Sequence, residues 1–445
     1  MASTSRTCIR LLSLLCAALL AASCGMVGLS AFAAEGSADS LKYTKNSAGT
    51  AYTVSGVSDY TVTSISVPAS YGGLPVTAIA DNAFRDWKKL TSITLPEGIT
   101  SIGNYAFYGC VGLTTVTLPA SCKSVGAAPF SHATALTEIK VASGSSAFRS
   151  YDGLLYSADG ATLIACPAGK TGSYTVRSGV TAITGYAFYG SALTGLTLPT
   201  GLKTIGGYAF SESAITGITV PSGITSLGNS LFENCKALTS VSLPSTVTSM
   251  GENVFCGCTA LKSITLPDKL KTLNMWAFDG CSALETVKLP ANLTGIANYA
   301  FQNCKSLKSL TIPDGVTAVG RGAFLGCTAL KTLSFSSKLE SVGKRAFYKC
   351  SGLTDVYFDL EAPGRWETSW DEGLTATVHW KKAPPAAIHG DVNKDGTLSI
   401  SDVTLLLIML ETDAAYENLD RCDVYKDGAA NITDVTMLVV MLDLK

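Results

Sequence analysis

Two acidic segments near the C-terminal end of the chain have the residue types and spacing of a cation-binding loop. The first runs from Asp391 to Asp402 and the second from Asp423 to Asp434, 32 residues further on. Both carry oxygen-bearing side chains at positions 1, 5, 9 and 12 and a glycine at position 6. Calcium takes six to eight oxygen ligands from a 12-residue loop of this pattern, which turns sharply at the glycine. The sequence therefore predicts two calcium sites.

The two loops differ in their expected ligands. The first is expected to use Asp391, Asn393, Asp395, the carbonyl of Thr397, Ser399 through a water, and Asp402. The second is expected to use Asp423, Asp427, the carbonyl of Ala429, Asn431 and Asp434. Tyr425 stands at the third position of the second loop, and a phenol is a poor calcium ligand. We expect the second site to be the weaker one.

Each loop leads directly into an apolar helix, predicted over residues 403–410 and 435–442, and no regular entering helix precedes the first loop. This duplicated arrangement, over residues 390–445, resembles the type I dockerin, a small all-α module that attaches secreted proteins to cohesin domains of a cellulosome-like scaffold. The resemblance implies a cohesin partner, faced by loop positions 10 and 11. These are Ile400, Ser401, Ile432 and Thr433. The near-identical halves are expected to bind in two orientations; a calcium-stabilised domain without a partner is the alternative.

The opposite end of the chain predicts the compartment. Residues 1–33 contain Arg6 and Arg10, then an apolar run over 11–22, then Ala31-Phe-Ala33. This order is typical of a cleaved secretory signal, and Cys24 leaves a lipoprotein signal as the alternative. The rest of the chain has no apolar run long enough to span a membrane. We expect a secreted protein held on a cell surface or scaffold through its C-terminal module.

An internal repeat occupies most of the chain. Phenylalanines recur every 22 or 23 residues, apart from one gap of 58, at positions 84, 107, 130, 188, 210, 232, 255, 278, 301, 324 and 347. No single unit of this length can bury its own apolar residues, so the units must stack. The spacing predicts about eleven coils of a β-rich solenoid.

The repeated pattern Leu-x-x-Ile-x-Leu-Pro, followed by Ala-Phe and Cys, resembles the BspA-type leucine-rich repeat of bacterial surface proteins. The resemblance implies a solenoid over residues 76–357, a β-hairpin insertion over 141–180, and β-rich caps over 35–75 and 355–380. Residues 381–389 are then a short, stiff linker.

Seven cysteines share one repeat position, three residues after the phenylalanine. They are Cys110, Cys235, Cys258, Cys281, Cys304, Cys327 and Cys350. Disulfides are common in secreted proteins. However, coils about 4.8 Å apart with parallel side chains have poor geometry for bridging. We expect a buried column of free thiols.

Catalytic residues are scarce. The three histidines, His132, His379 and His389, fall in separate regions and indicate no catalytic triad. The acidic residues of the repeats stand at different turn positions among lysines. We interpret the chain as a noncatalytic adhesion or ligand-binding protein. A dockerin-borne carbohydrate-degrading enzyme with paired carboxylates and a rigid spacer without a ligand are the alternatives.

Two rows of repeat residues are candidate ligand contacts. Outward strand positions are mostly hydroxylic, as at Thr94, Thr117, Thr265 and Thr311. A second row, two residues before the phenylalanine, reads Tyr105, Tyr186, Tyr208, Trp276 and Tyr299. These rings suit a polysaccharide or a host or bacterial surface protein, although threonine also suits exposed strands and the rings also suit turn packing. A net charge of +4 over residues 35–389 argues against nucleic acid.

We predict that Asp391→Ala weakens calcium binding more than Asp423→Ala. The first loop offers its full ligand set, whereas the second has Tyr425 at one ligand position. Calorimetric titration of both variants against the wild-type chain measures this difference. The reverse order of affinities would contradict the assignment of the stronger site.

Overall fold

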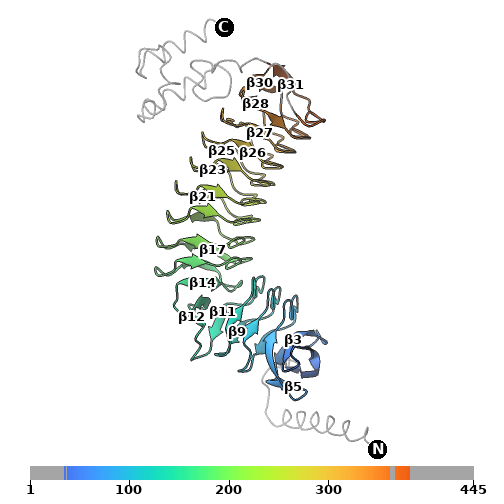
Figure 1. The fold of residues 1–445 in the computed structure, drawn as a ribbon, viewed down its shortest axis with the longest axis vertical. Coiled ribbons are helices and arrows are strands. Elements are labelled where there is room, and N and C mark those ends of the chain that lie inside the picture. Colours follow the sequence, from blue (N-terminus) through green and yellow to red (C-terminus); the bar gives the residue numbers. More distant parts are fainter. Residues whose placement is uncertain (1–34, 37, 361–365, 381–445) are drawn as a thin grey trace, which may run out of the picture.

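The structure, a computed structural model, describes residues 35–36, 38–360 and 366–380. They form a curved solenoid whose β-coils stack along an open arc (Figure 1). The predicted solenoid is confirmed, with about 14 turns in place of the eleven expected from the phenylalanine spacing. The further turns include strands outside that repeat, such as β4 (Ser64–Ser66) and β31 (Thr377–Trp380), which join the same row through backbone pairing.

Most coils contribute one strand to each of two rows, which we call the first and second strand rows; the coil around Thr311 has no strand in the first row. Besides β4 and β31, the first strand row contains β1 (Glu35–Gly36), β7 (Ser92–Thr94), β9 (Thr115–Leu118), β11 (Glu138–Val141), β15 (Gly172–Thr175), β17 (Leu193–Thr197), β19 (Gly217–Thr219), β21 (Ser240–Ser242), β23 (Ser263–Thr265), β25 (Thr286–Lys288), β28 (Thr332–Phe335) and β30 (Asp355–Phe358). Pairing within this row is parallel, and Ser263 lies opposite Thr286.

The second strand row is made mostly of two-residue strands. It contains β3 (Tyr52–Val57), β6 (Leu74–Ile79), β8 (Ser101–Ile102), β10 (Ser124–Val125), β14 (Thr162–Ala165), β16 (Ala182–Ile183), β18 (Thr204–Ile205), β20 (Ser226–Leu227), β22 (Ser249–Met250), β24 (Thr272–Leu273), β26 (Gly295–Ile296), β27 (Ala318–Val319) and β29 (Ser341–Val342). At the N-terminal end, η1 (Ala38–Ser40) precedes β2 (Leu41–Lys45), which pairs antiparallel with β3, and β5 (Ser70–Tyr71) pairs with β6.

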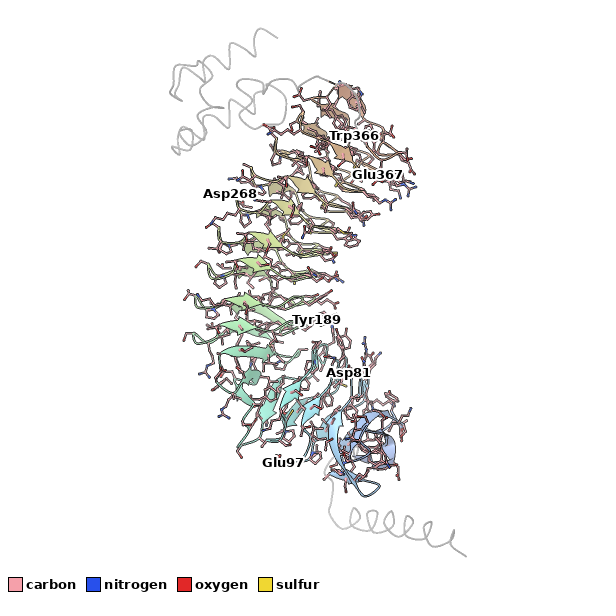
Figure 2. All side chains as sticks on the ribbon, in the orientation of Figure 1. Asp81, Glu97, Tyr189, Asp268, Trp366 and Glu367 are labelled. Atoms are coloured by element: carbon pink, nitrogen blue, oxygen red, sulfur yellow. The ribbon has the colours of Figure 1, made fainter. Side chains whose placement is uncertain are left out.

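The Ala-Phe turns lie along the concave side of the arc, and we call this side the inner edge (Figure 2). The Phe278 amide donates to the carbonyl of Ala300 in the next coil (2.8 Å), and equivalent bonds link the coils from Phe188 onward. All eleven repeat phenylalanines are buried. Their rings stack from coil to coil, as for Phe255 and Phe278 at a centroid distance of 5.4 Å. The phenylalanine repeat therefore sets the register of the stack.

The cysteine column also links neighbouring coils. Cys281 donates its thiol to the carbonyl of Phe255 in the preceding coil (3.0 Å), and the other six cysteines of the column make the same bond. All ten cysteines in the described residues are free. Burial raises the pKa of the Cys235 thiol to about 12, so it stays protonated and able to donate at neutral pH.

A β-hairpin interrupts the stack within residues 141–180. Strands β12 (Phe148–Tyr151) and β13 (Leu154–Ser157) pair antiparallel. The Asp152-Gly153 turn joins them with positive φ at both residues, 50° and 82°, as in the tight turn that matches strand twist. Strand β13 also pairs antiparallel with β14, which carries the chain into the next coil.

Strand β13 divides the apolar interior into two cores. Its side chains alternate between the faces of the strand, as β geometry requires. Leu155 packs into an N-terminal core that extends from Leu41 to Ala165. Leu154 and Tyr156 pack into a C-terminal core that extends to Phe358. All three β13 side chains are fully buried, so the hairpin separates the apolar interior of the solenoid into two cores.

We predict that Phe278→Ala lowers the free energy of unfolding by about 3 to 5 kcal/mol, because it opens a cavity inside the C-terminal core. Thr265→Ala, at an exposed position of β23, should cost far less. Chemical denaturation of both variants measures the difference. Equal losses would mean that the inward and outward positions are assigned wrongly.

Candidate functional site

The residues predicted to bind calcium and cohesin lie outside the described residues. These residues run from Asp391 to Asp434, and the predicted signal and linker also lie outside the described residues. In the described part of the chain, no cluster of three or more His, Cys, Asp or Glu side chains suits a metal ion. No helix among these residues is long and apolar enough to cross a membrane. Two candidate sites remain among the described residues. We call the ring positions Tyr105, Tyr186, Tyr208, Trp276 and Tyr299 the aromatic row, and the outward strand positions Thr94, Thr117, Thr265 and Thr311 the hydroxyl face.

The aromatic row occupies a strained backbone position. Tyr105, Tyr186, Tyr208, Trp276 and Tyr299 all have left-handed backbones, with φ between 54 and 64°. The other six coils also have positive φ at this position, which asparagine and glycine tolerate better than other residues; these residues are Asn82, Ala128, Ser230, Asn253, Gly322 and Arg345. A bulky residue there costs on the order of 1 kcal/mol or more. The contacts of these rings must therefore compensate for the strain.

Three of the five rings contact one another across the bend of the arc. Tyr105, before the hairpin, lies edge-on to Tyr186, after it, with centroids 6.1 Å apart. Tyr186 in turn stacks on Tyr208 at 4.8 Å. On either side, Arg85 lies over the ring of Tyr108, and Tyr108 contacts Tyr189. The rings before and after the hairpin thus form one cluster at the inner edge.

Polar groups complete this cluster. The Nε2 atom of His132 lies 3.2 Å from Oε2 of Glu212, and the Tyr189 hydroxyl donates to Oε1 of the same carboxylate (3.0 Å). Burial, a hydrogen bond with Tyr108 and the charge of Glu212 raise the pKa of the Tyr189 hydroxyl. A Cβ atom on Gly190 would come within 2.8 Å of the His132 ring, so the two segments meet closely.

We call these residues, Tyr105, Tyr108, His132, Tyr186, Tyr189, Tyr208 and Glu212, the clasp. Figure 2 shows Tyr189 on the concave side of the arc, at the bend. Before the hairpin, the Phe107 amide donates to the carbonyl of Pro129 in the next turn, and after it the Phe188 amide donates to the carbonyl of Ala209. Between these two bonds, no phenylalanine amide within residues 38–360 links the turn of Phe130 to that of Phe188. The clasp therefore holds the inner edge together where the backbone ladder is interrupted.

Trp276 and Tyr299 form a separate stacked pair, with centroids 5.9 Å apart and planes 7° from parallel. Tyr299 also packs over Gly322, where an added Cβ would lie 2.6 Å from the ring. Both faces of the Tyr299 ring are thus covered. This packing favours a structural role for Tyr299, and a ligand contact at Trp276 stays a prediction.

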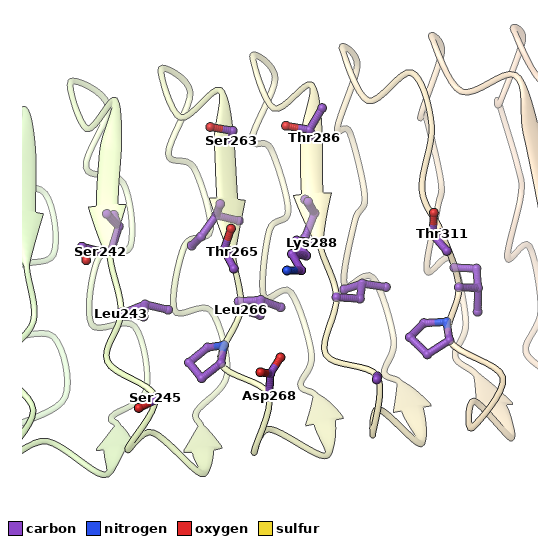
Figure 3. A pocket seen from close by; sticks show the side chains of 18 of the residues that line it. Ser242, Leu243, Ser245, Ser263, Thr265, Leu266, Asp268, Thr286, Lys288 and Thr311 are labelled. Atoms are coloured by element: carbon purple, nitrogen blue, oxygen red, sulfur yellow. The ribbon is translucent and has the colours of Figure 1, made fainter. Parts of the chain in front are cut away.

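The hydroxyl face is exposed at the predicted positions, and the hairpin separates its two parts. Thr94 and Thr117 lie on β7 and β9 before the hairpin, whereas Thr265 and Thr311 lie beyond it. A groove of about 1340 Å³ covers the second part (Figure 3). It crosses β21, β23, β25 and the segment around Thr311. The structure thus shows a surface channel at half of the predicted hydroxyl face.

Three of the seven clasp residues, Tyr105, Tyr186 and Tyr208, were predicted from the sequence as possible ligand contacts. The cluster that they form with Tyr108, His132, Tyr189 and Glu212 was not predicted. A signal was available in the gap of 58 residues between Phe130 and Phe188, which has Tyr105, Tyr108 and His132 near its start and Tyr186 and Tyr189 near its end. Only folding around the hairpin brings these residues together.

Two family models match the chain. The BspA type leucine rich repeat region matches in six copies, over residues 58–152, 168–285 and 248–362. The dockerin type I domain matches residues 389–443. The chain belongs to the BspA-type leucine-rich repeat family and carries a dockerin type I domain at its C-terminal end. A dockerin implies calcium-dependent binding to a cohesin domain, and the two families together point to an extracellular or cell-surface protein.

Solved structures of bacterial leucine-rich repeat proteins are similar to this chain. One from Eubacterium ventriosum has a TM-score of 0.50 and 23% identity, over 64% of this chain and 92% of its own. A leucine-rich cell surface protein from Faecalibacterium prausnitzii has a TM-score of 0.48 and 23% identity, over 79% of this chain and 98% of its own. The first likeness shows the shared fold. No curated protein matches the chain significantly.

We predict that Tyr189→Ala loosens the bend, because it removes the aromatic contacts and the hydrogen bond that join the two segments. The expected cost is about 1 to 3 kcal/mol. Small-angle X-ray scattering should show a larger maximum dimension than for wild type. Tyr60→Ala, at an exposed tyrosine away from the clasp, is the control. An unchanged scattering profile for Tyr189→Ala would contradict the role of the clasp.

Proposed function

We propose that this chain is a secreted, noncatalytic repeat protein that attaches to a cohesin-bearing scaffold and presents its solenoid as an adhesion or ligand-binding surface. The observation that carries the proposal is the combination in one chain of a long exposed solenoid and a dockerin type I match. The dockerin supplies the attachment, with two calcium sites of which the second is weaker. The solenoid supplies a large, ordered surface.

The histidines and repeat thiols within residues 38–360 and 366–380 are engaged in the fold, which supports the noncatalytic part. His132 is engaged in the clasp, and His379 lies 2.7 Å from Asp355 in the last coils. The seven thiols of the cysteine column are buried, and their raised pKa values keep them from acting as nucleophiles. Neither described histidine therefore has a cysteine nucleophile beside it.

One observation favours the rival function, a carbohydrate-degrading enzyme. Burial raises the pKa of the Asp279 carboxyl, the direction that a general acid of a glycoside hydrolase requires. However, the nearby polar side chains of Gln302 and Asn303 act in the opposite direction and lower this pKa, which suits a structural carboxylate. Hydrolysis of a polysaccharide by the wild-type chain, lost in Asp279→Asn, would favour the enzyme.

We predict that the two halves of the dockerin are alternative cohesin-binding faces. Replacing Ile400 and Ser401 with charged residues should leave much of the affinity, because the domain can turn over and use Ile432 and Thr433. Changing both pairs should abolish binding. Calcium uptake should persist in all variants, since these positions supply no side-chain ligand.

The measurement is affinity for a cohesin from the same organism, with and without a calcium chelator. Calcium titration of each variant is the control for folding of the domain. Binding that survives the double replacement, or a wild-type chain that binds no cohesin, would falsify the attachment.

A further inference from the structure

The groove over the C-terminal half of the first strand row is built from one repeating set of positions. Four successive coils line it, each with an outward residue at the end of the strand segment: Ser242, Thr265, Lys288 and Thr311. These four side chains are exposed. Figure 3 shows them in a row that crosses the strands, beside a second row of aliphatic side chains such as Leu243 and Leu266.

The curvature of the solenoid opens this groove. In the same coils the inner edge keeps its backbone hydrogen bonds, from Phe232 to Val254 and onward to Ala323. The first strand row, by contrast, is broken between β21 and β23, and β25 has no paired strand after it. Asp268, at the rim of the groove, lies on the convex side of the arc (Figure 2). The coils are therefore hydrogen-bonded along the inner edge and separated along the first strand row.

The hydroxyl groups of the solenoid fall into two classes. Threonines that directly precede a strand bond to the preceding coil, as Thr239 Oγ1 does to the carbonyl of Thr216 (2.9 Å). The hydroxyls in the groove, at Ser242, Thr265 and Thr311, have no hydrogen-bond partner in the described part of the chain. The groove hydroxyls are thus free to bond to a ligand, and the fold does not need them.

The charge of the groove is low. Lys288 is the one cationic side chain among the groove residues, and it forms no ion pair within the described residues. Asp268 and Asp314 stand at the rim. Half-buried Leu243 and Leu289 offer apolar surface beside the hydroxyl row. Alternating apolar and hydroxyl contacts match the CH faces and hydroxyl groups of a sugar chain.

The repeat distance favours a sugar chain over a peptide. Paired strands lie about 4.8 Å apart, and the phenylalanine rings of these four coils repeat at 5.4 to 5.6 Å, a range that includes the length of one sugar unit in an extended β-linked glycan. An extended peptide repeats its side-chain direction every two residues, about 6.8 Å, and falls out of step. A peptide lying across the strands is also unable to join their hydrogen-bond ladder.

We propose that this groove binds an extended, uncharged β-linked polysaccharide whose chain runs across the coils with about one sugar unit per coil. The inference rests on the proposed function, in which the solenoid presents a ligand-binding surface, and names the ligand of that surface. Each coil supplies one hydroxyl or the Lys288 amine as a hydrogen-bond donor, and half-buried Leu243 and Leu289 supply the apolar surface.

The experiment titrates the full-length chain with cellohexaose, xylohexaose and mannohexaose, which are extended, and with maltohexaose, which coils. At least one extended hexasaccharide should bind, with maltohexaose weaker by about tenfold or more. Thr265→Val combined with Thr311→Val should weaken binding by about tenfold, through two lost hydrogen bonds. Thr94→Val combined with Thr117→Val, at the same repeat positions before the hairpin, is the matched control and should bind as wild type.

Several outcomes would overturn the inference. They are no binding of any extended hexasaccharide, equal binding of maltohexaose, equal losses in both double variants, and displacement of the sugar by an extended serine-rich peptide. Thermal unfolding of each variant shows whether it is folded. Cohesin affinity is measured on the same preparations, so a chain that binds cohesin but no sugar removes this inference and leaves the attachment intact.

Discussion

The structure depends on the packing of each repeat phenylalanine between those of its neighbours. A coil of 22 or 23 residues is too short to enclose its own apolar side chains, so it is stable only when a second coil covers it. The Phe278 ring is fully buried because Phe255 and Phe301 stack on its two sides. The adjacent cysteine thiol adds a hydrogen bond to the preceding coil. Register, and hence every surface row, follows from this contact.

The hairpin is the place where that contact fails. No phenylalanine pair bridges Phe130 and Phe188, and strand β13 stands between the two cores instead. The clasp replaces the missing inner-edge ladder with side-chain contacts, among them Tyr105 with Tyr186 and Tyr189 with Glu212. Strained left-handed backbones at the tyrosines are tolerated there because the rings hold two segments together. The arc of the solenoid changes direction near this point (Figure 1).

Curvature then determines what the outer surface offers. Coils tied at the inner edge separate on the opposite side, which breaks the first strand row into short ladders and opens a groove. The Ser242, Thr265 and Thr311 hydroxyls of this groove have no hydrogen-bond partner among the described residues, whereas Thr239 and its equivalents support the stack. The same residue type thus has two uses, and position within the coil separates them. A dockerin at the end of such a solenoid would hold this surface at a scaffold.

The sequence by itself determined the repeat, the inward phenylalanines, the cysteine column and the dockerin loops, because each is a local pattern with a fixed spacing. Burial of a residue such as Phe278 follows from its place in the repeat and needs no knowledge of distant contacts. Only the tertiary structure decided that Leu154 and Leu155 face different cores, that His132 meets Glu212, and that coils splay beside Lys288. These depend on how the hairpin turns the chain and on curvature accumulated over many coils. No short window of sequence encodes either, since the residues involved are brought together by the stack as a whole.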